Sequence, residues 1–212
     1  MGYMDFHSHI LYGVDHGVQD HELYSQLIAE YKKNGITTLV FTPHLFHPLV
    51  KTNISNIRPN FEQAEQEAAK LGLSVYLGCE LYLGSQTEVK TIPIDGRYAL
   101  VEFPPEACPI GLERKIKQLC DQGYEVVVAH VERYPWLKAD SDLMSMFKDN
   151  GCWIQVNVSG IENRRALPFI ERDLVDIIAD DNHGDLSLPQ RLRSALDLYP
   201  AINARMQSMA LD

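Results

Sequence analysis

Short segments rich in β-branched and apolar residues alternate with segments of helical pattern along this sequence, and this alternation restricts the fold more than any other feature. Seven segments have a strand pattern: 3–7, 36–41, 73–77, 98–103, 124–129, 152–158 and 175–179. Strands that alternate with helices are typical of a mostly parallel sheet. The sequence therefore predicts one α/β domain that spans residues 1–212.

The helical segments carry their own start and stop signals. Asp20 is a typical N-cap for a helix whose apolar face contains Leu23, Leu27 and Tyr31. Further helices are predicted around 61–71, 116–120, 143–147 and 167–170 and from 188 onward, and most of the helices end at a glycine. Because no glycine-rich loop follows the first strand, a dinucleotide-binding sheet lacks its usual signature. A (β/α) barrel or barrel-like sheet is the better prediction.

Charge and the length of the apolar runs exclude several classes of protein. The formal net charge is −10, which would repel a polyanion, so no nucleic acid partner is expected. No apolar run approaches the roughly 20 residues of a membrane-spanning helix, and the first residues lack the pattern of a signal peptide. The four cysteines are widely spaced, and we expect reduced core thiols in a cytoplasmic protein without membrane insertion.

Histidines and acidic residues gather where the predicted strands end. The C-terminal ends of parallel strands open on one face of a barrel, so these side chains are expected to converge there. Imidazole and carboxylate groups suit Zn²⁺, Mn²⁺ or Fe²⁺, and so many ligands exceed the need of one ion. We predict two to three divalent ions. The nine candidate metal ligands are His7, His9, His16, His44, Glu80, Glu102, His130, Asp181 and His183.

Several nearby residues allow two interpretations. A single histidine at a strand end is more often a structural group than a ligand, and only the convergence of the whole set favours metal binding. His21 and His47 are expected to be bystanders, although His47 is close enough to touch a substrate. Asp15 is either a turn residue or a partner of a ligand. Asp5 either orients a ligating imidazole or pairs near the barrel floor.

A competing phosphatase signature occurs in the sequence. The segment from Cys108 to Arg114 matches Cys-x5-Arg, in which a cysteine attacks phosphorus. However, Pro109 removes a backbone N–H from the loop that must hold the phosphate, and Glu113 adds a negative charge. We therefore expect metal chemistry rather than cysteine chemistry.

At the predicted site the sequence resembles a known family. The segments concerned are 5–9 (DFHSH), 42–44 (TPH), 78–80 (GCE), 100–103 (LVEF), 129–134 (AHVERY) and 179–183 (ADDNH). They resemble the polymerase-and-histidinol-phosphatase (PHP) superfamily and are most similar to its CpsB/CapC-type bacterial protein-tyrosine phosphatases. The similarity runs in order through nearly the whole chain.

The resemblance implies a distorted seven-stranded (β/α) TIM-like barrel of the PHP type with a trinuclear site. Manganese is the expected metal, with iron or zinc as alternatives. One ion would take His7, His9, Glu80 and Asp181, a second would take Glu80, Glu102 and His130, and a third would take His16, His44 and His183. The implied catalytic residues are Arg133, which would hold a phosphate oxygen, Asp181 and His183.

The resemblance also implies a substrate, namely phosphotyrosine on a bacterial tyrosine kinase that controls capsule or exopolysaccharide synthesis. Three features depart from the family pattern. His16 replaces an acidic residue, Leu188 stands where a second phosphate-binding arginine is expected, with Arg191 as a possible substitute, and the segment 158–173 is short.

The predicted function is that of a metal-dependent protein-tyrosine phosphatase. Clustered divalent ions suit this chemistry because they bind phosphoryl oxygens and activate water. The first alternative is a PHP-type phosphatase for a small ester such as histidinol phosphate. Less favoured are a nuclease-like phosphodiesterase and a non-catalytic scaffold for a polysaccharide-assembly kinase. An oligomer is possible.

Overall fold

All seven predicted strands are present in the computed structural model, which describes residues 2–84, 89–209 and 211. They are β1 Tyr3–Ser8, β2 Ile36–Phe41, β4 Ser74–Leu77, β6 Tyr98–Glu102, β7 Glu125–Val128, β8 Trp153–Asn157 and β9 Ile177–Ala179. Two very short strands were not predicted, namely β3 His44–Leu45 and β5 Glu80–Tyr82. Every pairing between these strands is parallel, as expected.

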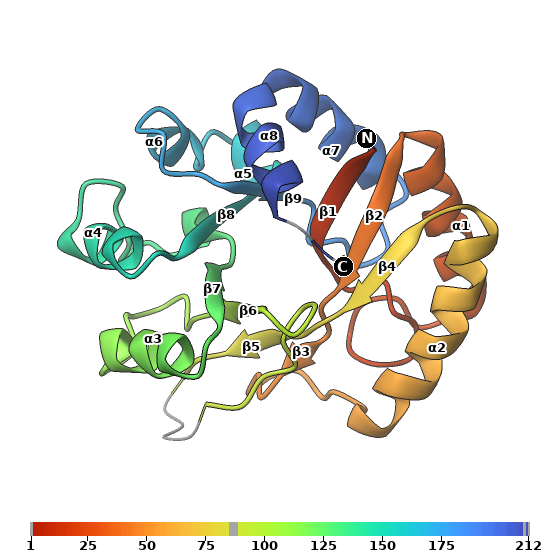
Figure 1. Cartoon of the computed structure of the whole chain (residues 1–212), viewed down its shortest axis with the longest axis horizontal. Coiled ribbons are helices and arrows are strands. Elements are labelled where there is room, and N and C mark those ends of the chain that lie inside the picture. Colours follow the sequence, from red (N-terminus) through yellow and green to blue (C-terminus); the bar gives the residue numbers. More distant parts are fainter. Residues whose placement is uncertain (1, 85–88, 210, 212) are drawn as a thin grey trace.

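The strands form a ring that is split into two sheets, β1-β2-β4 and β3-β5-β6-β7-β8-β9. The split arises because β2 and β4 are interrupted and then resume as β3 and β5 (Figure 1). At the other seam, the Asp181 amide donates to the His7 carbonyl (3.0 Å) and the His9 amide donates to the Asn182 carbonyl (2.9 Å). The prediction of a distorted seven-stranded (β/α) barrel is confirmed, and the interrupted strands account for the distortion.

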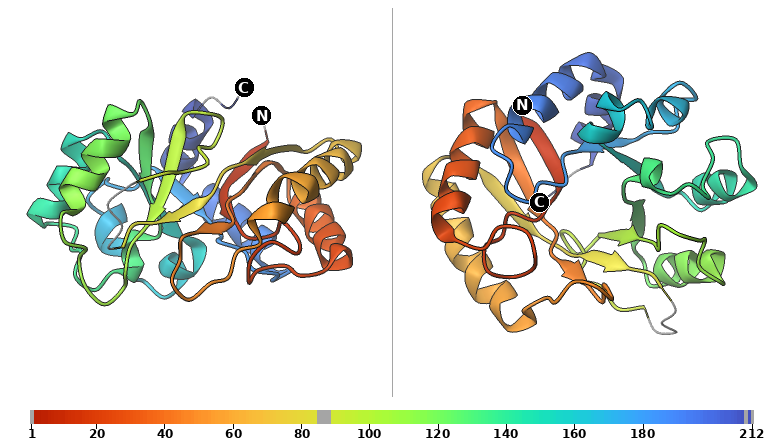
Figure 2. Two further views of the ribbon diagram at one scale, coloured as in Figure 1. Left: turned by 90° about the horizontal axis from the view of Figure 1, so that it is seen from below. Right: turned by 180° about the vertical axis from the view of Figure 1, so that it is seen from behind.

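The helices surround the ring of strands on its outside (Figures 1 and 2). The predicted helices are α1 His21–Lys33, α2 Ile54–Lys70, α3 Leu112–Asp121, α4 Asp142–Asp149, α6 Leu167–Ile170 and α7 Leu188–Leu198. The elements that were not predicted are the 3₁₀ turn η1 Val131–Arg133, α5 Val158–Glu162 and α8 Pro200–Ser208. Asp20 caps α1 as predicted, because its carboxylate accepts a hydrogen bond from the Leu23 amide (2.8 Å). None of the described helices combines the length and apolar character needed to cross a membrane.

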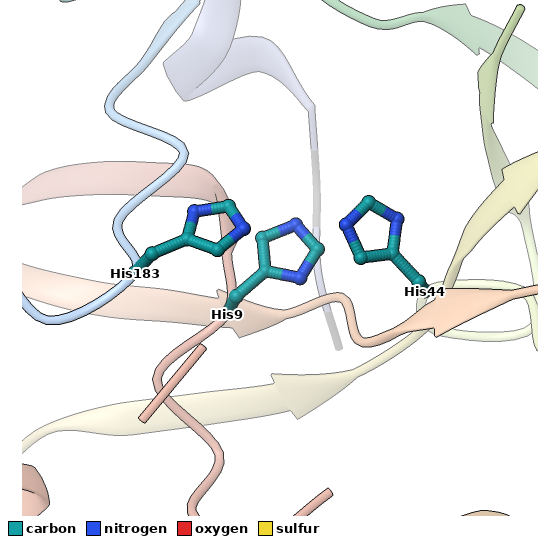
Figure 3. A group of neighbouring side chains, drawn as sticks. All are labelled: His9, His44 and His183. Carbon is teal, nitrogen blue, oxygen red and sulfur yellow. The ribbon is translucent and has the colours of Figure 1, made fainter. Parts of the chain in front are cut away.

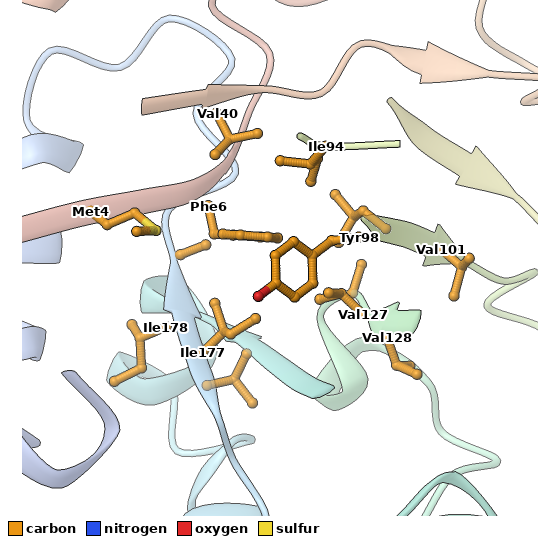
Figure 4. Packing of buried hydrophobic residues seen from close by; sticks show 14 of the residues in the cluster. Met4, Phe6, Val40, Ile94, Tyr98, Val101, Val127, Val128, Ile177 and Ile178 are labelled. Atoms are coloured by element: carbon orange, nitrogen blue, oxygen red, sulfur yellow. The ribbon is translucent and has the colours of Figure 1, made fainter. Parts of the chain in front are cut away.

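Apolar side chains fill the interior of the ring. Phe6 of β1 and Tyr98 of β6 are fully buried and meet edge to face, with ring centroids 5.6 Å apart (Figure 4). Valine and isoleucine side chains from β7 and β9 surround them (Figure 4). This packing fixes the positions of the strands whose ends carry the candidate ligands.

An irregularity in β1 places two consecutive side chains toward the interior. Asp5 pairs with Leu39 and Ser8 with Phe41, so a step of three residues on β1 faces a step of two on β2. Regular alternation would send Phe6 and His7 to opposite faces of the sheet. Because of the irregularity, Phe6 packs into the core while the His7 ring reaches Gln155 of β8. Such irregularities are common beside active sites, where they redirect a side chain.

The cysteines are free, as predicted, but they are not all core residues. Cys79 and Cys152 are buried and Cys120 is partly buried, whereas Cys108 is exposed. The expectation of core thiols was therefore wrong for Cys108. It precedes α3, where the left-handed Gly111 (φ 70°) leads the chain into the helix.

The Tyr98 hydroxyl gives a test of the core. It is buried and finds no hydrogen-bond partner among the described residues. Burying an unpaired hydroxyl costs about 1–3 kcal/mol. Tyr98→Phe should therefore leave the free energy of unfolding unchanged or raise it, whereas Tyr98→Ala should lower it by about 3–5 kcal/mol because it leaves a cavity. Chemical denaturation checks both variants, and clear destabilisation by Tyr98→Phe would show that the hydroxyl has a partner.

Candidate metal centre

All nine candidate ligands lie at or beyond the C-terminal ends of β1, β2, β4, β6, β7 and β9. His7 is on β1 and His9 directly follows that strand. His44 is on β3, Glu80 is on β5 and Glu102 ends β6. The remaining four come from loops: His16 after β1, His130 after β7, and Asp181 and His183 after β9. Each of the nine belongs to at least one group of three side chains whose donor atoms lie within 4.8 Å of one another. Except for the exposed His16 and the partly buried His183, all are buried.

Four donor atoms have the mutual spacing of ligands around one ion. His7 Nε2 and His9 Nε2 are 3.2 Å apart, and each lies 3.2–3.4 Å from Glu80 Oε2 and from Asp181 Oδ1. Atoms that bind an ion at about 2.1 Å lie about 3.0–3.4 Å apart at octahedral or tetrahedral angles. Asp181 Oδ1 is also buried without a hydrogen bond from any described residue. These four groups therefore fit a divalent cation.

Hydrogen bonds to the Nδ1 atoms of His7 and His9 leave their Nε2 atoms free for a metal ion. Gln155 Oε1 accepts a hydrogen bond from the His130 amide (2.9 Å) and lies 3.2 Å from His7 Nδ1. Asp15 Oδ2 lies 2.7 Å from His9 Nδ1. Both partners are acceptors, so each Nδ1 carries the proton and each Nε2 presents a lone pair toward the other. In the neutral imidazoles these two lone pairs face each other across 3.2 Å, and they repel unless a metal ion or a proton lies between them.

Glu80 connects this group to the rest of the centre. Its Oε1 atom lies 2.7 Å from His130 Nε2, and its Oε2 atom lies 3.0 Å from His44 Nδ1. His44 Nδ1 also lies 2.9 Å from Glu102 Oε1. A carboxylate with different neighbours on its two oxygens is suited to bridge adjacent ions.

The His44 ring also contacts other histidine rings of the centre. The rings of His183, His9 and His44 follow one another in a row, with His9 in the middle (Figure 3). His9 and His183 are stacked with centroids 4.2 Å apart, and His16 stacks on His44 at 5.0 Å. The residues implied for a third ion are thus neighbours, although His16 groups most closely with Asp15 and His44.

Arg133 lies beside the centre and pairs with Asp181. Its Nη2 atom is 2.7 Å from Asp181 Oδ2, which also accepts a hydrogen bond from the Asn157 side chain (3.0 Å). These two contacts fix Asp181 Oδ2, so that Asp181 Oδ1 points toward His7 and His9. The backbone of Asp181 (φ 52°) and of His130 (φ 33°) is left-handed, which is uncommon for residues other than glycine. Such strain is typical of functional sites.

The pKa values reflect the density of charged groups. Burial acts to raise the pKa of Glu80, but His7, His130 and His44 hold it well below its usual range. Burial acts to lower the pKa of His9, but Asp15, Asp181 and Glu80 raise it well above its usual range. Burial and the adjacent His9 lower the pKa of His183 to about 4. The Glu80 carboxylate is therefore ionised and attracts cations, while His183 is neutral near pH 7 and able to coordinate one.

A cavity of about 450 Å³ opens over the candidate ligands. Its lining includes His16, His44, Glu102, Arg133 and His183. It also includes His47, whose ring lies 5.0 Å from that of His44, so the predicted bystander is close enough to meet a substrate. By contrast, His21 pairs with Glu67 on the outside of the barrel.

Sequence analysis missed part of the layer behind the ligands. Gln155 and Asn157 are buried on β8 and are joined by a hydrogen bond of 2.6 Å. Their signal was two polar residues at alternate positions of an otherwise apolar strand. Asp15 is resolved as a partner of His9. Asp5 contacts the His7 backbone amide (3.4 Å) rather than its ring, and shares the Tyr31 hydroxyl with Asp180.

Two further sequence features lie away from the centre. Arg191, the candidate second phosphate-binding residue, pairs with Glu162 and Asp185. It is not among the described residues that line the cavity over the ligands. Burial raises the pKa of Cys108, which disfavours the thiolate that cysteine chemistry requires.

Gln155 offers a test of the layer behind the ligands. Replacing it with leucine keeps the volume but removes the acceptor that orients His7, so metal affinity should fall roughly 10–100-fold. Isothermal titration of the metal-free protein measures this change, and Gln26→Leu on the exposed face of α1 is the control. Unchanged affinity in Gln155→Leu would show that this glutamine does not support a ligand.

Known proteins resemble this chain in sequence over nearly its whole length. A sequence model of the family "Capsular polysaccharide synthesis, CpsB/CapC" matches residues 3–206. The tyrosine-protein phosphatase CpsB of Streptococcus pneumoniae is 31% identical over an alignment of 215 positions that covers 92% of this chain and 88% of that protein. The tyrosine-protein phosphatase CpsB of Streptococcus agalactiae is 30% identical over 200 residues, covering 85% of this chain and 82% of that protein.

Solved structures share the fold. A structure from the work on YwqE of Bacillus subtilis and CpsB of S. pneumoniae, described as metal-dependent tyrosine phosphatases, superposes with a TM-score of 0.80. Its sequence is 22% identical, and the match covers 93% of this chain and 86% of that one. A phosphotriesterase homology protein from Escherichia coli, with phosphate in its active site, superposes with a TM-score of 0.55 at 13% identity, covering 99% of this chain and 92% of that one. Because the family model spans nearly all of the sequence, this chain belongs to the CpsB/CapC family.

Proposed function

We propose that this chain is a metal-dependent protein-tyrosine phosphatase that binds two to three divalent ions, with manganese as the expected metal. The observation that carries the proposal is the spacing of 3.2–3.4 Å among donor atoms of His7, His9, Glu80 and Asp181. Five further candidate ligands adjoin them: His16, His44, Glu102, His130 and His183. The relatives in the family that are named as tyrosine-protein phosphatases support the same reaction.

The residues of the chain divide the work between metal binding and substrate binding. When bound, clustered divalent ions polarise phosphoryl oxygens and activate water. Arg133 has the geometry to grip a phosphate oxygen, because its side chain is 49% exposed and only part of its guanidinium faces Asp181. Asp181 and His183 complete the proposed catalytic set at the edge of the cavity. A phenolate leaving group, with a parent pKa of about 10, makes little demand on an acid catalyst.

The proposed substrate is a phosphotyrosine protein, specifically a bacterial tyrosine kinase that controls capsule or exopolysaccharide synthesis. The family description, which refers to capsular polysaccharide synthesis, supports this context. We further propose that the enzyme acts in the cytoplasm. A site that draws on residues from His7 to His183 supports the proposal that 1–212 functions as one domain.

Chelation separates metal chemistry from cysteine chemistry. Removal of the ions should abolish hydrolysis of a phosphotyrosine peptide, and added Mn²⁺ should restore it, whereas Cys108→Ser should keep nearly full activity. Elemental analysis of gently purified protein should find two to three equivalents of Mn, Fe or Zn. An enzyme that tolerates chelators but loses activity in Cys108→Ser would reverse the assignment. Rates on histidinol phosphate and on a phosphodiester, measured in parallel, test the alternative substrates.

Arg133 provides the second test. If it grips the substrate phosphate, Arg133→Ala should reduce kcat/KM by an amount equivalent to about 2–4 kcal/mol, by analogy with the loss of one oxyanion-hole donor. Metal content should be retained, because Asn157 still holds Asp181 Oδ2. Arg133→Lys should recover only part of the loss, since lysine lacks the fork of parallel N–H donors. A wild-type kcat/KM in fully metal-loaded Arg133→Ala would exclude a role in phosphate binding.

A further inference from the structure

A second cavity adjoins the metal centre on the far side of Arg133. It has a volume of about 350 Å³, and Arg133 lines both this cavity and the one over the candidate ligands. Its apolar wall includes Tyr134, Pro135 and Phe169. A peptide whose phosphotyrosine enters the metal centre therefore has an adjoining place for a neighbouring side chain. We call this second cavity the side pocket.

The side pocket is cationic although the whole chain is acidic. Lys138 and Arg165 line it together with Arg133. Within the part of the chain that the structure describes, neither Lys138 nor Arg165 has an acidic partner, whereas Arg172 nearby pairs with Asp140. The formal net charge of the chain is −10, so the charge around the side pocket is opposite in sign to that of the chain as a whole.

Among the described residues, the acidic side chain that lines the side pocket forms no ion pair with Lys138 or Arg165. Glu132 is the one acidic residue among the described residues that line it. The Glu132 Oε1 atom accepts a hydrogen bond from the Asn157 amide (3.2 Å), and its Oε2 atom is buried. The cations of the pocket thus remain available to a ligand.

The backbone holds Arg165 in place. The Arg165 amide donates to the Asn163 side chain (3.0 Å), and the next residue, Ala166, is fully buried and donates to the Gly160 carbonyl (2.9 Å). On the opposite wall, the Lys138 carbonyl accepts hydrogen bonds from the amide (3.1 Å) and hydroxyl (2.7 Å) of Ser141. The two cationic side chains therefore project from fixed parts of the chain.

We propose that the side pocket is a specificity subsite that binds an acidic side chain, glutamate or aspartate, located next to the phosphotyrosine of the substrate. Its cationic rim suits a carboxylate, and its apolar wall suits the methylene groups and backbone beside it. The inference rests on the proposed phosphatase function and adds a preference within it. It predicts that an acidic residue in the peptide improves binding. The average field of a chain of charge −10 predicts the reverse, because it repels acidic peptides.

The metal-loaded enzyme tests the proposal with peptides that contain one phosphotyrosine. A single glutamate is placed in turn at each position from three before to three after the phosphotyrosine, and each peptide has a glutamine counterpart. At one or more positions, glutamate should raise kcat/KM by roughly three- to fivefold, the range expected of a partly exposed ion pair. The gain should come from KM, and it should shrink at high salt.

Two variants with the same change of charge separate the subsite from the general field. Arg165→Glu should abolish or reverse the preference for glutamate and leave the glutamine peptides little affected. Arg58→Glu, on the exposed side of α2, makes the same change of charge away from the pocket and should keep the preference.

The possible results are distinguishable. Equal or slower hydrolysis of every glutamate peptide would overturn the subsite and leave the phosphatase function standing. Equal loss of the preference in Arg58→Glu and Arg165→Glu would likewise overturn it. In a companion set with a second phosphotyrosine in place of the glutamate, a preference for that residue without one for glutamate would overturn the assignment to a carboxylate. The absence of hydrolysis of all the phosphotyrosine peptides would overturn both the function and the subsite.

Discussion

The carboxylate of Glu80 is the group on which the arrangement of the metal centre depends. It is 1% exposed, and its two oxygens lie between 2.7 and 3.4 Å from nitrogens of His7, His9, His44 and His130. A buried carboxylate is costly unless it is paired, so the surrounding imidazoles are a condition for its position. That position in turn requires the break between β4 and β5. Gly78 lies at this break, where a Cβ atom would approach Ile94 Cγ1 to 2.3 Å, so only glycine fits without a rearrangement.

The positions of the nine candidate ligands could be predicted because topology alone brings them together. Once parallel strands are recognised, a histidine or acid at the end of each strand must lie on the same face, whatever the details of packing. Gln155 and Asn157 could not be assigned in this way, because an amide in a strand has many uses and its partner is chosen by tertiary contacts.

The strands β3 and β5, with two and three residues, are too short to leave a periodic pattern. Helix α5 was missed because its sequence, Val-Ser-Gly-Ile-Glu, has little helical preference. Gly160 is nonetheless required there, since a Cβ atom would lie 2.5 Å from Glu132 Cγ.

Arg133 lies where the candidate metal centre and the side pocket meet. Its guanidinium faces the Asp181 carboxylate, lines the cavity over the candidate ligands and also lines the side pocket. A cation beside a cluster of metal ligands opposes metal binding by its charge, and Asp181 offsets part of that charge. The proposed role in binding the substrate phosphate would give this cation a use. The fold places it there through η1, which begins directly after the left-handed His130. One strained turn therefore fixes both a candidate ligand and the candidate phosphate-binding residue.

The seam between β9 and β1 has a consequence for the lifetime of the protein in the cell. The hydrogen bonds across this seam belong to the amides and carbonyls of His7, His9, Asp181 and Asn182, three of which are candidate ligands. Closing the barrel and holding an ion are thus coupled, and an ion that binds only the closed form would stabilise it by an amount that grows with the logarithm of its free concentration. When divalent ions are scarce this stabilisation would be lost, and opening of the seam would expose the first strand to proteases. The abundance of the enzyme would then follow the metal supply of the cell without any dedicated sensor.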